Sequence, residues 1–170
     1  MLQLHIFFAG VVLAVGARAA EPPPEVQRAL ATAQLQGVVH TLRTIPEACT
    51  RLEGRFTGEA RAPYALTAVR TSARCQPRAA LVDADIAKPS TASGWIFNDE
   101  IRVPSASCSG QVAVVGIWRK AAASAVPTLD AQGRVRVYLK DGLDAAAAGR
   151  LGELPRYAVG LAVQGAQCKP

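Results

Sequence analysis

The chain of 170 residues carries 19 Lys or Arg and 13 Asp or Glu, which gives a formal net charge of +6. Its length suits one domain with a single hydrophobic core. Beyond residue 20 no window holds the roughly 18 uninterrupted apolar residues of a transmembrane helix, so we expect no membrane anchor in the mature chain. The basic balance favours anionic partners. We expect no nucleic acid among them.

Residues 1–20 are typical of a secretory signal peptide. An apolar run over 6–16 is followed by Ala17-Arg18-Ala19, which matches the A-x-A pattern of a cleavage site. The run is too short to span a bilayer, which takes about 20 residues. We therefore expect cleavage near Ala19 or Ala20 and a periplasmic or secreted mature protein.

A proline-rich leader and a helix are predicted at the start of the mature chain. Three consecutive prolines favour an extended leader over 21–24. Apolar residues then recur near helical spacing, which predicts an amphipathic helix over 25–42 that ends before Pro46. The apolar positions of this helix are Val26, Leu30, Ala33, Val38 and Leu42.

After residue 50 the hydrophobic period changes from helical to two, which predicts strands. Leu52–Thr57 alternates, and Tyr64–Thr71 is rich in β-formers. The turn-like residues 58–63 between them predict an antiparallel hairpin. Further strands are predicted over 79–84, 95–103, 111–119, 134–139 and 157–164.

One predicted strand is apolar on both faces. Gln111–Trp118 shows this pattern, which is typical of a central strand. We predict that Val112–Trp118 pairs antiparallel with Ala158–Gln164. An alanine-rich stretch predicts a short helix over 141–154. The fold class is therefore α+β in a single domain over 21–170: an N-terminal amphipathic helix, a mainly antiparallel sheet of about six to seven strands, and one short late helix.

Four cysteines predict two disulfides, because an even number in an exported chain is typical of bridged pairs. The cysteines lack the C-x-x-C spacing that is typical of a zinc or redox site. The hairpin brings Cys49 and Cys75 to one end, and the pairing of 112–118 with 158–164 does the same for Cys108 and Cys168. We therefore predict the bridges Cys49–Cys75 and Cys108–Cys168.

Few residues of the chain point to catalysis. His40 is the one histidine of the mature chain, and no G-x-S-x-G turn exposes a serine nucleophile. Asp83 and Asp85 lie two apart on a predicted strand, and Asp99 and Glu100 lie in a predicted turn. Surface acids at strand ends give the same pattern. Because phosphate-loop, dinucleotide and metal-ligand motifs are missing, we predict no cofactor and no metal.

Basic residues are concentrated over 43–78, where seven Arg stand against three Glu, a net charge of +4. Tyr138 shares the polar face of its predicted strand with two Arg, a combination that binds anionic or aromatic partners. Solvated surface arginines are the alternative explanation. The candidate binding residues are Arg51, Arg55, Arg61, Arg70, Arg134, Arg136 and Tyr138.

These features predict an exported, non-enzymatic binding protein of the cell envelope, whose partner is a protein or an anionic envelope polymer. A hydrolase inhibitor and an assembly accessory both fit this class. The alternative is a small secreted hydrolase that uses Asp83, Asp85 and Asp99. In that case these carboxylates would converge in one cleft.

Overall fold

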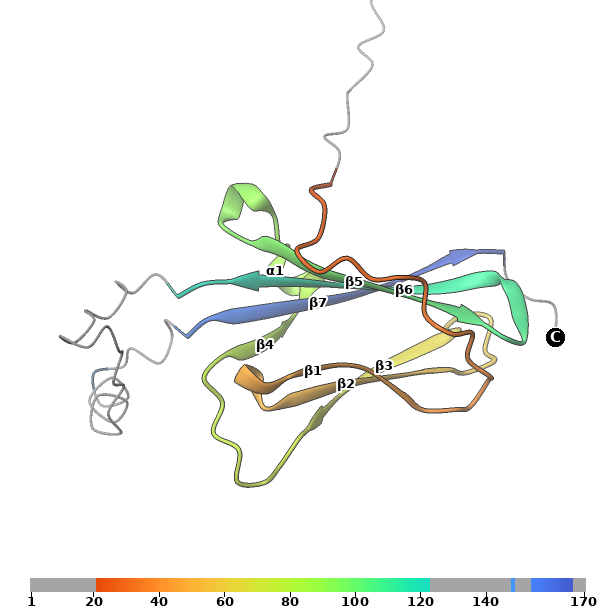
Figure 1. Cartoon of the computed structure of the whole chain (residues 1–170), viewed down its shortest axis with the longest axis horizontal. Coiled ribbons are helices and arrows are strands. Elements are labelled where there is room, and N and C mark those ends of the chain that lie inside the picture. The colour runs from red at the N-terminus through yellow and green to blue at the C-terminus, as the bar shows by residue number, and fades with distance from the viewer. Residues whose placement is uncertain (1–20, 123–147, 149–153, 167–170) are drawn as a thin grey trace, which may run out of the picture.

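The computed structural model describes residues 21–122, 148 and 154–166. These residues form strands and three short helical segments (Figure 1). The strands are β1 (His40–Ile45), β2 (Thr50–Phe56), β3 (Tyr64–Arg70), β4 (Ala80–Asp83), β5 (Ile96–Ser105), β6 (Cys108–Lys120) and β7 (Arg156–Gly165). The helical segments are η1 (Pro46–Ala48), α1 (Ala84–Ala87) and η2 (Thr91–Ser93).

The strands form two sheets. The smaller sheet has the order β1-β2-β3 and the larger sheet the order β4-β7-β6-β5. All pairs are antiparallel except β4 with β7, which is parallel. The prediction of a mainly antiparallel β fold is confirmed, but the strands divide into two sheets.

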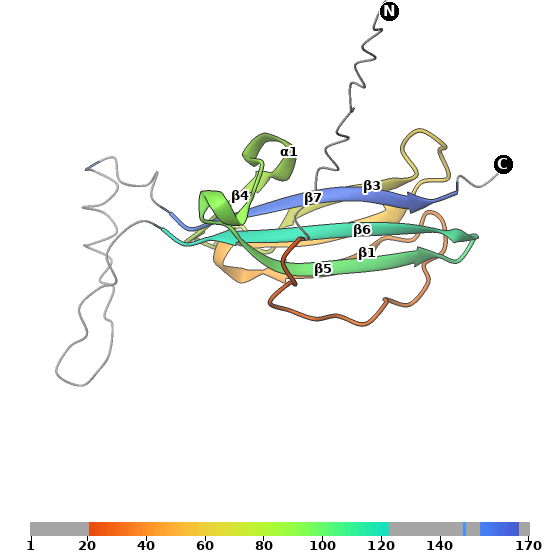
Figure 2. The same cartoon turned by 90° about the horizontal axis from the view of Figure 1, so that it is seen from above.

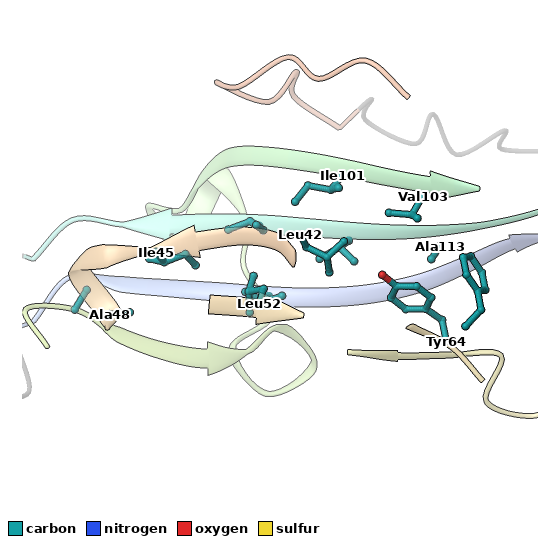
Figure 3. Close-up of a cluster of buried hydrophobic side chains, with 13 residues drawn as sticks. Leu42, Ile45, Ala48, Leu52, Tyr64, Ile101, Val103 and Ala113 are labelled. Atoms are coloured by element: carbon teal, nitrogen blue, oxygen red, sulfur yellow. The ribbon is translucent and has the colours of Figure 1, made fainter. Parts of the chain in front are cut away.

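The hydrophobic core lies between the sheets, which face each other as two layers (Figure 1). Period-two alternation places every second side chain inward. The inward side chains are Leu42, Ile45, Leu52 and Phe56 on the smaller sheet, where a bulge interrupts the alternation of β1, and Ile101, Val103, Ala113, Val115 and Ile117 on the larger sheet (Figure 3). The architecture is a two-layer β-sandwich.

The predicted helix over 25–42 is wrong. Residues 25–37, which we call the N-terminal strap, are extended and run beside β5 (Figure 2), and β1 begins at His40. The backbone N–H groups of Ala31 and Gln34 donate to β5 at 2.9 Å. An edge strand presents unpaired backbone groups. Covering that edge satisfies the strap's own backbone groups, so this tertiary contact overrides the weak helical period.

The predicted strand pairings in both sheets are confirmed. The β2–β3 hairpin places Phe56 opposite Tyr64, on either side of the turn over 58–63. The β6–β7 pairing sets Val112 opposite Gln164 and Trp118 opposite Ala158. β6 lies between β7 and β5, as its two apolar faces predicted.

The predicted turn at Asp99 and Glu100 is wrong, because β5 continues through both residues. The strand has a bulge at Asn98, where the register shifts between Phe97 and Asp99. Phe97 therefore pairs with Trp118 on the outer face, while Asp99 pairs with Ile117 on the inner face. Simple alternation would have put both side chains on one face.

The disulfide Cys49–Cys75 is confirmed, with a Cα–Cα distance of 5.8 Å. It links the residue after η1 to the loop that follows β3. The second predicted bridge includes Cys168, which lies outside the described residues, so it stays a prediction. Cys108 Sγ lies 3.9 Å from the carbonyl oxygen of Ala166, two residues before Cys168.

Three further predictions fall outside the described residues. They are the signal peptide over 1–20, the strand over 134–139 and nearly all of the helix over 141–154.

Gly54 in β2 is predicted to tolerate no side chain. A Cβ there would lie 1.7 Å from the Tyr64 hydroxyl oxygen and 2.4 Å from Tyr64 Cζ, so the buried ring has to move. We expect Gly54→Ala to lower the free energy of unfolding by about 1–3 kcal/mol, as overpacking does, in urea denaturation. Gly116→Ala is the control, because its Cβ would meet Phe97 at 3.7 Å, an ordinary contact. Equal stability of the two variants would contradict the prediction.

Candidate functional site

One end of the sandwich gathers basic side chains from distant parts of the chain. There β6 ends and β7 begins, and the antiparallel register places Arg119 opposite Tyr157 and Lys120 opposite Arg156. Arg119 and Tyr157 lie on the inner face of the sheet, two residues along from the inward Ile117–Val159 pair. The register alone therefore brings three cations to one sheet end.

These residues line a pocket of about 410 Å³. Glu47 of η1 and Arg78, just before β4, complete the charged lining. The backbone N–H groups of Arg78 and Ala79 both donate to the Glu47 carbonyl, at 2.7 and 2.9 Å. The pocket is thus lined by four basic residues and one acidic residue, and an excess of positive charge around a hollow concentrates anions. The full lining is Glu47, Arg78, Arg119, Lys120, Ala121, Pro155, Arg156 and Tyr157.

Arg119 is held by the N-terminal strap. Its Nε donates to Glu25 Oε2 at 2.6 Å, and its Nη2 donates to Glu25 Oε1, so the pair is bidentate. Asn98 Nδ2 donates to the same carboxylate at 2.8 Å. The hydrogen bond to Glu25 raises the pKa of Arg119, so the guanidinium is charged at every accessible pH.

Two aromatic residues lie beside the pocket cations. Burial, followed by the nearby Glu47 carboxylate, raises the pKa of Tyr157, so its hydroxyl is neutral and able to donate at neutral pH. Lys120 Nζ lies 5.8 Å from the centroid of the buried Trp95 ring, within cation–π range. The pocket therefore offers a hydroxyl donor in addition to its charges.

A second charge cluster is buried between the sheets. Asp99 has no exposed surface, and both of its carboxylate oxygens accept from Arg28 Nε at 2.9 Å. Arg43 Nη1 donates to Asp99 Oδ2 at 2.8 Å. A bulge in β1 between Thr41 and Arg43 turns Arg43 to the inner face, beside Leu52 in register. This carboxylate joins the strap, β1 and β5, which indicates a structural role.

Asp99 does not meet the other two candidate catalytic carboxylates, Asp83 and Asp85. Asp83 caps α1 by accepting from the Asp85 backbone N–H at 2.7 Å, so Asp85 lies in α1 and not on the strand. Asp83, Val159, Ile117 and Asp99 form one row across the larger sheet. Three strand spacings of about 4.8 Å separate its two ends, or about 14 Å. Paired glycosidase carboxyls lie no more than about 9.5 Å apart.

His40 lies in β1 and is engaged by a buried tyrosine. Tyr64 Oη and His40 Nε2 are 2.8 Å apart, and burial lowers the pKa of His40. Burial also raises the pKa of Tyr64. His40 lines a second pocket of about 360 Å³ beneath the strap, together with Leu42 and Ile101. The described residues place no Ser hydroxyl in hydrogen-bond contact with this imidazole.

The structure disperses the predicted arginines. Arg51 and Arg55 lie on the outer face of β2, where Arg51 Nε donates to Glu53 at 2.8 Å. Arg61 is exposed in the turn before β3. Arg70 Nε donates to the carbonyl oxygen of Ser72 at 2.9 Å and so holds the loop that contains Cys75. Three other candidates lie outside the described residues: Arg134, Arg136 and Tyr138.

Sequence reasoning missed the pocket lining as a group. Arg78 lies in the basic region over 43–78, but Arg119, Lys120 and Arg156 do not stand out as a group, because they are far apart in the sequence. The available signal was the predicted pairing of 112–118 with 158–164, which, extended by two residues, sets Lys120 opposite Arg156. Arg78 joins them only through tertiary structure.

Comparison with family models, with curated proteins and with solved structures gives no match for this chain. Within the described part of the chain, no helix has the length and apolar character needed to cross a membrane. No group of three or more His, Cys, Asp or Glu among the described residues is arranged to hold a metal ion.

Glu25 is predicted to stabilise the fold less in acid than at neutral pH. Hydrogen bonds from Arg119, and then from Asn98, lower the pKa of Glu25 from 4.5 to about 2. Because the folded-state pKa lies below the unfolded-state value, this contribution is complete above about pH 4.5 and is lost as the pH falls toward 2. We expect the difference in Tm between the native protein and Glu25→Gln to shrink across that window. A difference that stays constant from pH 6 to pH 2.5 would count against the ion pair.

Proposed function

We propose that this is an exported, non-enzymatic binding protein that holds an anionic group of its partner in the basic pocket. The observation that carries the proposal is the convergence of Arg78, Arg119, Lys120 and Arg156 on one hollow of about 410 Å³. Charged guanidinium and ammonium groups around a partly enclosed site favour carboxylate and phosphate ligands. The partner is an anionic envelope polymer or an acidic protein surface, and no cofactor is required.

The positions of the carboxylates support binding over hydrolysis. Asp99 is engaged by two guanidinium groups, and Asp83 caps a helix about 14 Å away across the sheet. The alternative function, a hydrolase that uses Asp83, Asp85 and Asp99, requires them in one cleft. The separation of Asp99 from Asp83 therefore favours a binding protein over a hydrolase.

The proposed location follows from the cysteines and the predicted signal peptide. A disulfide is typical of an oxidising compartment, so Cys49–Cys75 supports a periplasmic or secreted protein. We propose Cys108–Cys168 as the second bridge, since β7 returns antiparallel along β6 and ends close to Cys108. Peptide mapping under non-reducing conditions tests this pairing, and a Cys49–Cys168 peptide would refute it.

Calorimetric titration with citrate and with inorganic phosphate tests the pocket. We expect binding at low salt that weakens as salt rises, because ions screen the contacts. The double variant Arg78→Ala with Lys120→Ala is expected to bind at least about tenfold more weakly. The matched control removes two cations elsewhere, Arg55→Ala with Arg61→Ala, and is expected to bind like the native protein. If both double variants lose the same affinity, the net charge of the protein explains the binding, and the pocket is not the binding site.

The two probes also separate the partner classes. A preference for citrate indicates carboxylate-rich partners, and a preference for phosphate indicates phosphate-rich polymers. No binding of either probe by the native protein at low salt, with measurable turnover lost in Asp83→Asn or Asp85→Asn, would favour the hydrolase.

A further inference from the structure

One pocket cation is shared between the pocket and the strap. Arg119 lines the pocket, yet its Nε and Nη2 already hold the Glu25 carboxylate. Glu25 belongs to the N-terminal strap, whose first contacts with β5 are the N–H groups of Glu25 and Val26 on Phe97 and Asn98 carbonyls, at 2.9 and 2.8 Å. The protein's own carboxylate thus occupies the bidentate position that a ligand carboxylate or phosphate would take.

We infer that Glu25 is an internal competitor for Arg119, and that an anion entering the pocket displaces Glu25 and releases the start of the strap from β5. This inference rests on the proposed function, since it assigns a regulation to the same pocket. The exchange is balanced in charge, because one carboxylate leaves the guanidinium as another anionic group arrives. No covalent step is involved.

The released part of the strap has a defined end. Arg28 donates to both oxygens of the buried Asp99, and Ala31 and Gln34 continue to donate to β5. Losing the Glu25 contact leaves these bonds intact, so release stops before Arg28. The segment ahead of Arg28, whose side chains are exposed or half-buried, leaves β5 only when the pocket is filled, which couples ligand binding to release of the backbone at Glu25 and Val26.

The coupling is reciprocal, as linkage requires. If the anion weakens the contact between Glu25 and Arg119, then removing the Glu25 charge strengthens anion binding. We expect Glu25→Gln to bind citrate about five- to tenfold more tightly than the native protein, at the lower end of usual coupling factors. Glu59→Gln is the matched control, because it makes the same change of charge on the exposed turn between β2 and β3, whereas the pocket residue Glu47 precedes β2.

Amide hydrogen exchange, read by NMR on the native protein with and without saturating citrate, separates displacement from simple electrostatics. We expect citrate to speed exchange at Glu25 and Val26 and to leave Ala31 and Gln34 unchanged. A gain in affinity in Glu25→Gln without faster exchange at Glu25 and Val26 would overturn the displacement. Equal affinities of Glu25→Gln and Glu59→Gln would overturn it as well.

The remaining outcomes distinguish this inference from the proposed function. Lower citrate affinity in Glu25→Gln means that Glu25 positions Arg119, which overturns competition while the binding pocket stands. If Glu25→Gln binds citrate and the native protein and Glu59→Gln do not, Glu25 blocks access of the anion to Arg119 completely, which supports the competition. Failure of citrate and phosphate to bind the native protein, Glu25→Gln and Glu59→Gln rejects the pocket and the inference together.

Discussion

Replacing Asp99 by Asn is expected to lower the free energy of unfolding by about 3–5 kcal/mol, which is the usual cost of breaking a buried ion pair by removing one partner. The carboxylate has no exposed surface and accepts from Arg28 and Arg43. The Asn side chain keeps the shape and loses the charge. Arg43, whose side chain is only 19% exposed, is then left with an uncompensated charge next to the core.

Urea denaturation monitored by Trp fluorescence measures this loss. Asp85→Asn is the control, because Asp85 is exposed in α1 and the change there is expected to stay within about 0.5 kcal/mol. The strap should loosen along with the fold, so hydrogen exchange at Ala31 and Gln34 should rise in Asp99→Asn. A loss below about 1 kcal/mol with unchanged exchange would mean that the three segments do not depend on this carboxylate.

Removing the Cys49–Cys75 bridge is expected to cost about 3–4 kcal/mol, from the loop-closure entropy of a 26-residue separation. The variant is Cys49→Ala with Cys75→Ala. The loop after β3 keeps other contacts, because Thr71 N–H donates to the Cys49 carbonyl at 2.9 Å and Arg78 N–H to the Glu47 carbonyl. The native fold is therefore expected to survive with lower stability.

The same denaturation experiment measures the bridge, with Ala73→Ser as a control in the same exposed loop. Arg78 follows the bridged loop and lines the pocket. Weaker citrate binding is therefore expected to accompany the loss of stability. A variant as stable as the native protein would show that the bridge adds no constraint to the unfolded chain.

The sequence predicts the fold best where side-chain alternation is regular. β2, β3, β6 and β7 show a clear period of two or a continuous apolar run, and their pairings follow from turn position and strand direction. The helix predicted over the N-terminal strap is wrong for a physical reason. Its apolar residues fit a helix, and only the presence of an open edge on β5, about 70 residues later, favours the extended form.

The charge clusters were harder to predict, because bulges decide them. An aspartate between Phe97 and Ile101 reads as a turn residue, and its burial makes sense only with Arg28 and Arg43 in place. The bulge at Asn98 that turns Asp99 inward has no signature in the alternation. The pocket likewise depends on Arg78 and Arg119 meeting at one end of the larger sheet from distant strands, which spacing along the chain does not reveal.

Among the described strands, the one parallel pair has a consequence for how the molecule is made. β4 and β7 are separated in the chain by the whole of β5 and β6, so β7 must arrive before β4 gains its one neighbour in the described part of the sheet. The strap likewise waits for a strand synthesised much later. A polypeptide that emerges from its amino end thus keeps the strap unpaired until β5 is made and β4 unpaired until β7 docks. Such long-range closure places refolding among the slower small domains, in milliseconds to seconds.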